Sequence, residues 1–69
     1  MSSRGKMVVK IGKRRFEKYP KGATVNIYIG DEEVDMFTNY EIGDSMEKFE
    51  ESCNEHMEYM KKAHGWDES

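Results

Sequence analysis

The spacing of the apolar residues changes once along this chain, near Gly43, and this change restricts the folds open to it. Before Gly43 apolar and polar residues alternate, as in residues 24–29, where Val25, Ile27 and Ile29 share one side. Alternation is typical of strands that bury one face. After Gly43 apolar residues recur every three or four positions, which is typical of an amphipathic helix. The sequence therefore predicts strands first and one helix last.

Turn signals divide the alternating region into strands. Gly12-Lys13 is a two-residue connection with a leading glycine, which suits a type II′ turn and places Val9 opposite Phe16. Residues 19–22 contain a proline and a glycine at positions that reverse the chain. These signals predict one hairpin and a further reversal before residue 24.

A second hairpin joins residues 24–29 to a strand at residues 34–42 through a polar turn. The alternation resumes at Val34, so we expect Phe37 to lie with Tyr28 on the outer face of the sheet.

The helical segment has signals at both ends. Asp44 followed by Glu47 is a variant of the capping box, and Gly65 fits a C-cap. The apolar stripe contains Met46, Phe49, Cys53, Met57, Met60 and His64. We predict a single α+β domain, a three- or four-stranded antiparallel β-meander followed by one C-terminal amphipathic α-helix packed on the sheet. Residues 1–5 and 66–69 are expected to be tails.

Charge is divided along the chain. Residues 1–30 hold eight Lys or Arg against one acid, a local charge of +7, whereas residues 31–69 hold thirteen acids against three Lys, or −10. With 69 residues, of which 36% are hydrophobic, a monomer would have a thin core, so we expect a homodimer. The single Cys53 cannot form an internal disulfide. With neither a membrane-spanning run nor a signal-peptide pattern, the sequence predicts a cytoplasmic protein.

Acidic residues repeat along the helix at spacings of three and four. They are Glu47, Glu51, Glu55 and Glu58 on one side, with Glu50 on its flank. Residues four apart rise ~6 Å along a helix, and phosphates rise ~3.4 Å per nucleotide, so the row matches every second phosphate. Acids at the hairpin tip would extend it: Asp31, Glu32, Glu33 and Asp35. The pattern predicts a phosphate-backbone mimic, and a solvated helix face is the alternative.

The basic segment supports a different hypothesis, direct binding of single-stranded nucleic acid. Its cations are Lys10, Lys13, Arg14, Arg15 and Lys18. Beside outward Tyr28 and Phe37 they would form a cationic stacking platform. The alternatives are protection of an edge strand and pairing with the acidic half. A plain protein-interaction module using Tyr28, Phe37 or Trp66 is a third possibility.

Metal and catalytic chemistry find little support in the sequence. Cys53, His56 and His64 suit zinc, but four ligands are lacking within one chain. No Ser/His/Asp order, phosphate loop or dedicated carboxylate pair is present. We expect no metal site, no cofactor and no catalytic residues, and therefore no enzyme.

The chain resembles the small early proteins with which bacteriophages disable host machinery. The resemblance lies in its short length, its strands at residues 24–29 and 34–42 and its acidic helix at residues 44–64. Similar in kind are two DNA-mimicking inhibitors, the uracil-DNA glycosylase inhibitor and the phage inhibitor of the histone-like protein HU. Some anti-CRISPR proteins share the format. The resemblance implies a non-enzymatic inhibitor that docks its acids on a basic host nucleic-acid-binding protein, with a histone-like protein as the first candidate. The basic residues 1–30 depart from the overall acidity of such mimics, which confines mimicry to the helix and hairpin tip.

Overall fold

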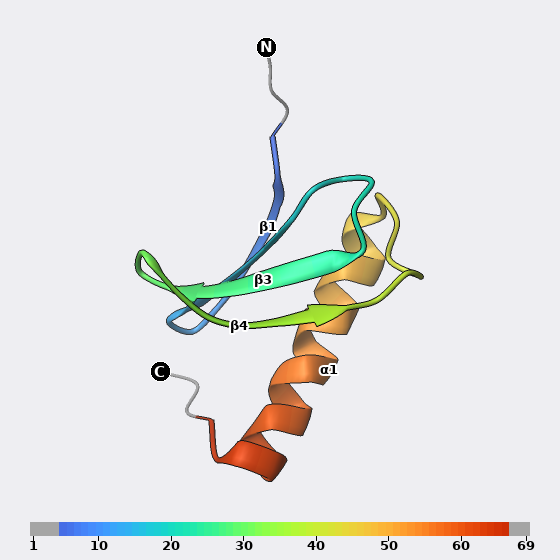
Figure 1. Ribbon diagram of the computed structural model, residues 1–69. Helices are drawn as coiled ribbons and strands as arrows, with labels where there is room; N and C mark the ends of the chain where they lie inside the picture. The colour runs from blue at the N-terminus through green and yellow to red at the C-terminus, as the bar shows by residue number, and fades with distance from the viewer. Residues whose placement is uncertain (1–4, 67–69) are drawn as a thin grey trace.

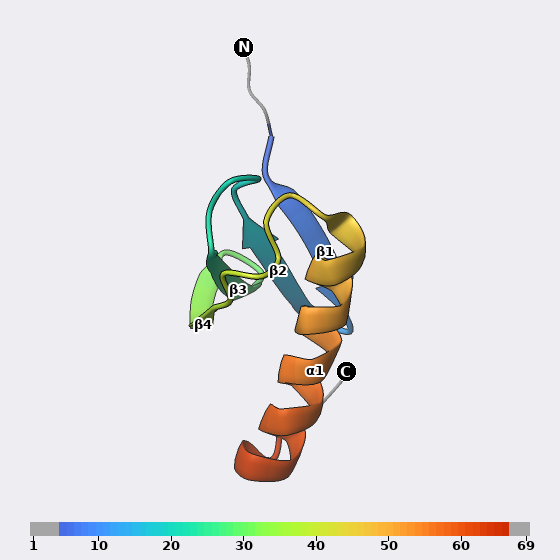
Figure 2. The ribbon, with the colours of Figure 1, turned by 90° about the vertical axis from the view of Figure 1, so that its right-hand side faces the viewer.

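Four strands precede one helix in the computed structural model, which describes residues 5–66 (Figure 1). The elements are β1 (Met7–Ile11), β2 (Arg14–Lys18), β3 (Thr24–Ile29), β4 (Glu32–Thr38) and α1 (Met46–His64). Each strand pairs antiparallel with the next, so β1 and β4 are the edges of a four-stranded meander. α1 packs on one face of this sheet, and its C-terminal part extends beyond the strands (Figures 1 and 2). The predicted α+β fold is confirmed.

The first hairpin forms as its turn residues predict. Ile11 pairs with Arg14, and Val9 pairs with Phe16. Gly12 has a φ of 60°, and no described residue other than glycine has a positive φ. A positive φ at the first turn position alone is the signature of a type II′ turn.

The second hairpin contains a β-bulge in β4. Tyr28 pairs with Glu33, whereas Ile27 pairs with Asp35, which leaves Val34 as an extra residue. Because side chains alternate along a strand, one extra residue moves every later side chain to the opposite face. The bulge therefore exchanges the two faces of β4 relative to simple alternation.

The expectation that Phe37 lies with Tyr28 on the outer face is wrong. Phe37 pairs with the buried Val25 and packs against the core, while Met36 is 53% exposed. β4 also ends at Thr38, earlier than predicted, because the chain then turns toward the helix.

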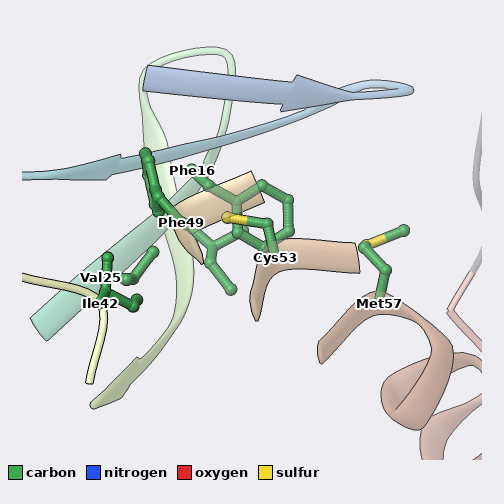
Figure 3. Packing of buried hydrophobic residues seen from close by; sticks show 7 residues of the cluster. Phe16, Val25, Ile42, Phe49, Cys53 and Met57 are labelled. Atoms are coloured by element: carbon green, nitrogen blue, oxygen red, sulfur yellow. The ribbon is translucent and has the colours of Figure 1, made fainter. Parts of the chain in front are cut away.

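The core lies between the inner face of the sheet and α1 (Figure 3). Its buried members are Phe16, Val25, Ile27, Ile42, Phe49, Cys53 and Met57. Met46 and His64, the two ends of the predicted apolar stripe, are exposed. Three buried residues from the middle of the helix therefore anchor α1 on the sheet.

The two ends of α1 are capped by different residues. Ser45, and not the predicted Asp44, is the N-cap, because its hydroxyl accepts a hydrogen bond from the Lys48 N–H at 3.3 Å. Gly65 is the C-cap, with a φ of 69°, and this prediction is confirmed. The following Trp66 donates its main-chain N–H to the carbonyl oxygen of Met60 and packs against the core, so it is not part of a tail.

Lys18 is a buried cation that connects two backbone segments. Its Nζ donates to the carbonyl oxygens of Tyr19 at 2.7 Å, Pro20 at 3.2 Å and Gly43 at 2.6 Å. Burial lowers the pKa of Lys18, and nearby Asp44 opposes that shift. Lys18 therefore fixes the start of the helix to the turn between β2 and β3.

Candidate functional site

The face of α1 opposite the core carries the predicted acidic row. Glu47, Glu51, Glu55 and Glu58 are all exposed, as is the flanking Glu50. At ~100° per residue the four glutamates lie across the helix from the buried Phe49, Cys53 and Met57. Since the buried side is fixed to the sheet, the row has a defined orientation.

The row is most negative over its first three members. Lys61 Nζ lies 3.3 Å from Glu58 Oε2, and this exposed pair partly neutralises the end of the row. Within residues 5–66, no ion pair engages Glu47, Glu51 or Glu55. Their carboxylates are therefore available to a partner.

The acids of the hairpin tip form a separate patch. Asp31, Glu32 and Glu33 are exposed at the turn between β3 and β4. Figure 1 shows this turn at one end of β3 and β4, and the first turn of α1 near their other end. The tip therefore does not continue the helical row as the sequence suggests.

Asp35, which the sequence groups with the tip acids, lies on the inner face of β4. Its Oδ2 is 3.3 Å from Nε2 of His56. The His56 ring stacks on Phe37 with 4.4 Å between centroids and meets the edge of Trp66 at 5.8 Å. The guanidinium carbon of Arg14 lies 4.2 Å from the Trp66 ring centroid. This group was missed because apolar residues occupy both alternating positions of β4, and the pattern alone does not reveal the bulge.

The five predicted nucleic-acid-binding cations do not share one surface. Lys10 and Lys13 are exposed, whereas Arg14 is 7% exposed and Lys18 1%. Arg15 lies over the Tyr28 ring at 5.1 Å and pairs with Glu17.

Glu17 partly neutralises the outer face of β2. Its Oε1 also lies 3.3 Å from Lys6 Nζ. The Arg15 guanidinium lowers the pKa of Glu17, and Lys6 makes a smaller contribution in the same direction. Arg15 and Lys6 thus share one carboxylate, and a continuous cationic groove does not form.

Two adjoining hollows lie between the end of β4, the loop after it and α1; we call them together the β4 groove. Both are lined by Asn39, Ser52 and Glu55, and Asn39 Nδ2 donates to Ser52 Oγ at 2.9 Å. The hollow of about 240 Å³ is also lined by Phe37, His56 and Tyr59. The hollow of about 190 Å³ is also lined by Glu41 and Glu51, together with Ile42 and one cation, Lys48. The groove thus has an aromatic end and an acidic end.

The three residues considered for zinc have different environments and do not form a metal site among the described residues. Burial raises the pKa of the Cys53 thiol to about 12, with a smaller contribution from Glu50. His56 stacks on Phe37 and contacts Trp66 edge-on, and His64 is exposed. Across residues 5–66, no three His, Cys, Asp or Glu side chains are placed to hold a metal ion.

Over the described part of the chain, no helix is long and apolar enough to cross a membrane.

Comparisons with known proteins found no relative of this chain. No protein-family model matches the sequence, and neither a curated protein nor a solved structure shows significant similarity to it.

Proposed function

We propose that this protein is a non-enzymatic inhibitor of the phage type, which acts in the host cytoplasm by presenting its acidic helix in place of DNA. Its target would be a host nucleic-acid-binding protein with a basic cleft, with a histone-like protein as the first candidate. The observation that carries the proposal is the exposed row of Glu47, Glu51, Glu55 and Glu58 on a helix whose opposite face is fixed.

Helix geometry gives the row a spacing that suits a DNA-binding cleft. Glutamates four residues apart rise ~6 Å, close to the rise of two nucleotides at ~3.4 Å each. Electrostatic steering and counterion release bring DNA phosphates to a basic cleft, and the same forces also act on carboxylates. The row can therefore compete with DNA for such a cleft.

The tip acids and a second copy of the chain have secondary roles in this proposal. Asp31, Glu32 and Glu33 would contact the target outside its main cleft, because they lie apart from the helix. A homodimer would present two helical rows.

Competition for DNA tests the proposal directly. The full chain is titrated into a histone-like protein bound to fluorescent duplex DNA, over a series of salt concentrations. We expect displacement of the DNA that weakens as salt rises, because the contacts are ionic. Absence of displacement at low salt would exclude this target.

Two matched variants assign any displacement to a surface. E47Q/E51Q/E55Q removes three charges from the helix, and D31N/E32Q/E33Q removes three from the tip. The helix variant should lose most of its ability to displace DNA, and the tip variant only a small part. Equal losses, or a larger loss in the tip variant, would contradict the assignment to the helix.

A further inference from the structure

Among residues 5–66, the outer edge of β4 presents main-chain groups that pair with no other strand. The Asn39 N–H donates to Ala23 O at 2.9 Å, so the main chain of Asn39 faces β3. Because antiparallel pairs alternate between bonded and non-bonded, Phe37 also faces β3, and Met36 and Thr38 direct their main-chain groups away from it. In the described part of the chain, β3 is the one strand that pairs with β4. This edge can therefore accept another strand.

The β4 groove begins where this edge ends. Phe37 and Asn39 belong to the last pairs of the hairpin and also line the groove. A strand added at Met36 and Thr38 would have every second side chain on the inner face, next to Tyr59 and the groove. Main-chain bonds and side-chain pockets would then act together, as in binding by strand addition.

The charge around this edge determines which charge a binding segment should carry. Residues 31–45 contain six acids and no Lys or Arg. From the helix the groove adds Glu51, Glu55 and one cation, Lys48, so its lining is net negative. Pairing of β4 with β4 of a second copy would oppose acidic strands, and like charges across a strand pair are destabilising. A cationic segment is complementary to the same surface.

We propose that the edge of β4 and the β4 groove bind an extended cationic segment of a partner protein as a fifth strand. Alternate Lys or Arg side chains of that segment would lie on the inner face and reach Glu51 and Glu55, and the apolar side chains between them would lie on the outer face beside the exposed Met36. This inference goes beyond the proposed function, because Glu47 and Glu58 lie outside the groove and need not take part.

A short peptide of alternating Lys and Val provides a probe, and nuclear magnetic resonance of the isotope-labelled full chain provides the readout. We expect amide shifts at Met36, Thr38 and Asn39 and along the groove. A copy of the peptide N-methylated at alternate positions should bind about tenfold or more weakly, because it loses at least two main-chain hydrogen bonds. A peptide of alternating Glu and Val should not bind.

Two double variants separate this inference from the proposed function. E51Q/E55Q changes the groove and should weaken peptide binding, whereas E47Q/E58Q changes only the outward row and should not. Shifts confined to the outward helix face, or equal affinity of the N-methylated peptide, would overturn the fifth-strand proposal and leave the DNA competition result unaffected. Concentration-dependent shifts of β4 without peptide would show that a second copy occupies the edge, and would also overturn it.

Discussion

The basic hairpin β1–β2 and the acidic helix α1 use their charges in opposite ways. Within the hairpin, Lys18 and Arg14 are buried, and Arg15 shares Glu17 with Lys6. On the helix, the glutamates of the row are exposed, and most lack an ion pair among the described residues. The positive charge of these four residues is thus part of the structure, while the negative charge of the helix is available to a partner.

The largest expected effect comes from removing the buried cation. Lys18→Met should lower the free energy of unfolding by about 3 kcal/mol, because three carbonyl oxygens lose a charged donor. Urea denaturation measures the change. The control Lys10→Met alters an exposed lysine on the neighbouring strand and should stay within about 0.5 kcal/mol of the parent. Similar values for the two variants would show that Lys18 does not hold the fold.

The second hairpin offers a test of the bulge. Phe37→Ala should cost about 2 kcal/mol, because the ring packs against the core and stacks on His56. Met36→Ala, one residue earlier on the exposed face, should change stability by less than about 0.5 kcal/mol. Thermal and urea unfolding of both variants measure the difference. A larger effect at Met36 would mean that β4 lacks the bulge.

The pH dependence of stability gives a smaller test of Lys18. Burial lowers the pKa of Lys18 below its ordinary 10.5, so between the lowered pKa and 10.5 the unfolded chain binds more protons than the folded one. Stability due to this group therefore rises with pH across that window. The difference in unfolding free energy between the parent and Lys18→Met should grow accordingly. A difference that stays constant or shrinks would contradict burial of the charged amine.

The smallest effect concerns the acids, and its sign is the informative part. Glu51→Gln with Glu55→Gln relieves repulsion between glutamates four residues apart and should raise stability by about 0.5 kcal/mol at low salt. The gain should shrink as salt rises. Urea denaturation at two salt concentrations measures it. A loss of stability would show that these glutamates stabilise the fold, as Lys18 does.

Local signals predicted most of the elements. The turn at Gly12, the bounds of β3 and the C-cap at Gly65 depend on residues close together in sequence. The exposure of the helical glutamates also follows from a local pattern, since they lie opposite the apolar stripe. These features needed no information about tertiary contacts.

Features that depend on distant residues were not predicted. Lys18 is buried because a carbonyl of Gly43, 25 residues away, accepts its proton in a hydrogen bond. Asp35 and His56 meet across 21 residues, and only after the bulge has turned Asp35 inward. The capping residue was placed one position early, because Asp44 and Ser45 are both good acceptors and backbone geometry decides between them.

The extra residue at Val34 lets β4 lose one residue without exchanging its two faces. If Val34 were deleted, the pairs Tyr28–Glu33 and Ile27–Asp35 would follow each other directly, and only the bulge would disappear. Asp35 and Phe37 would still face His56. A single-codon deletion at this position would thus keep the aromatic wall of the β4 groove, so a one-residue gap here in an alignment would not change what the helix meets.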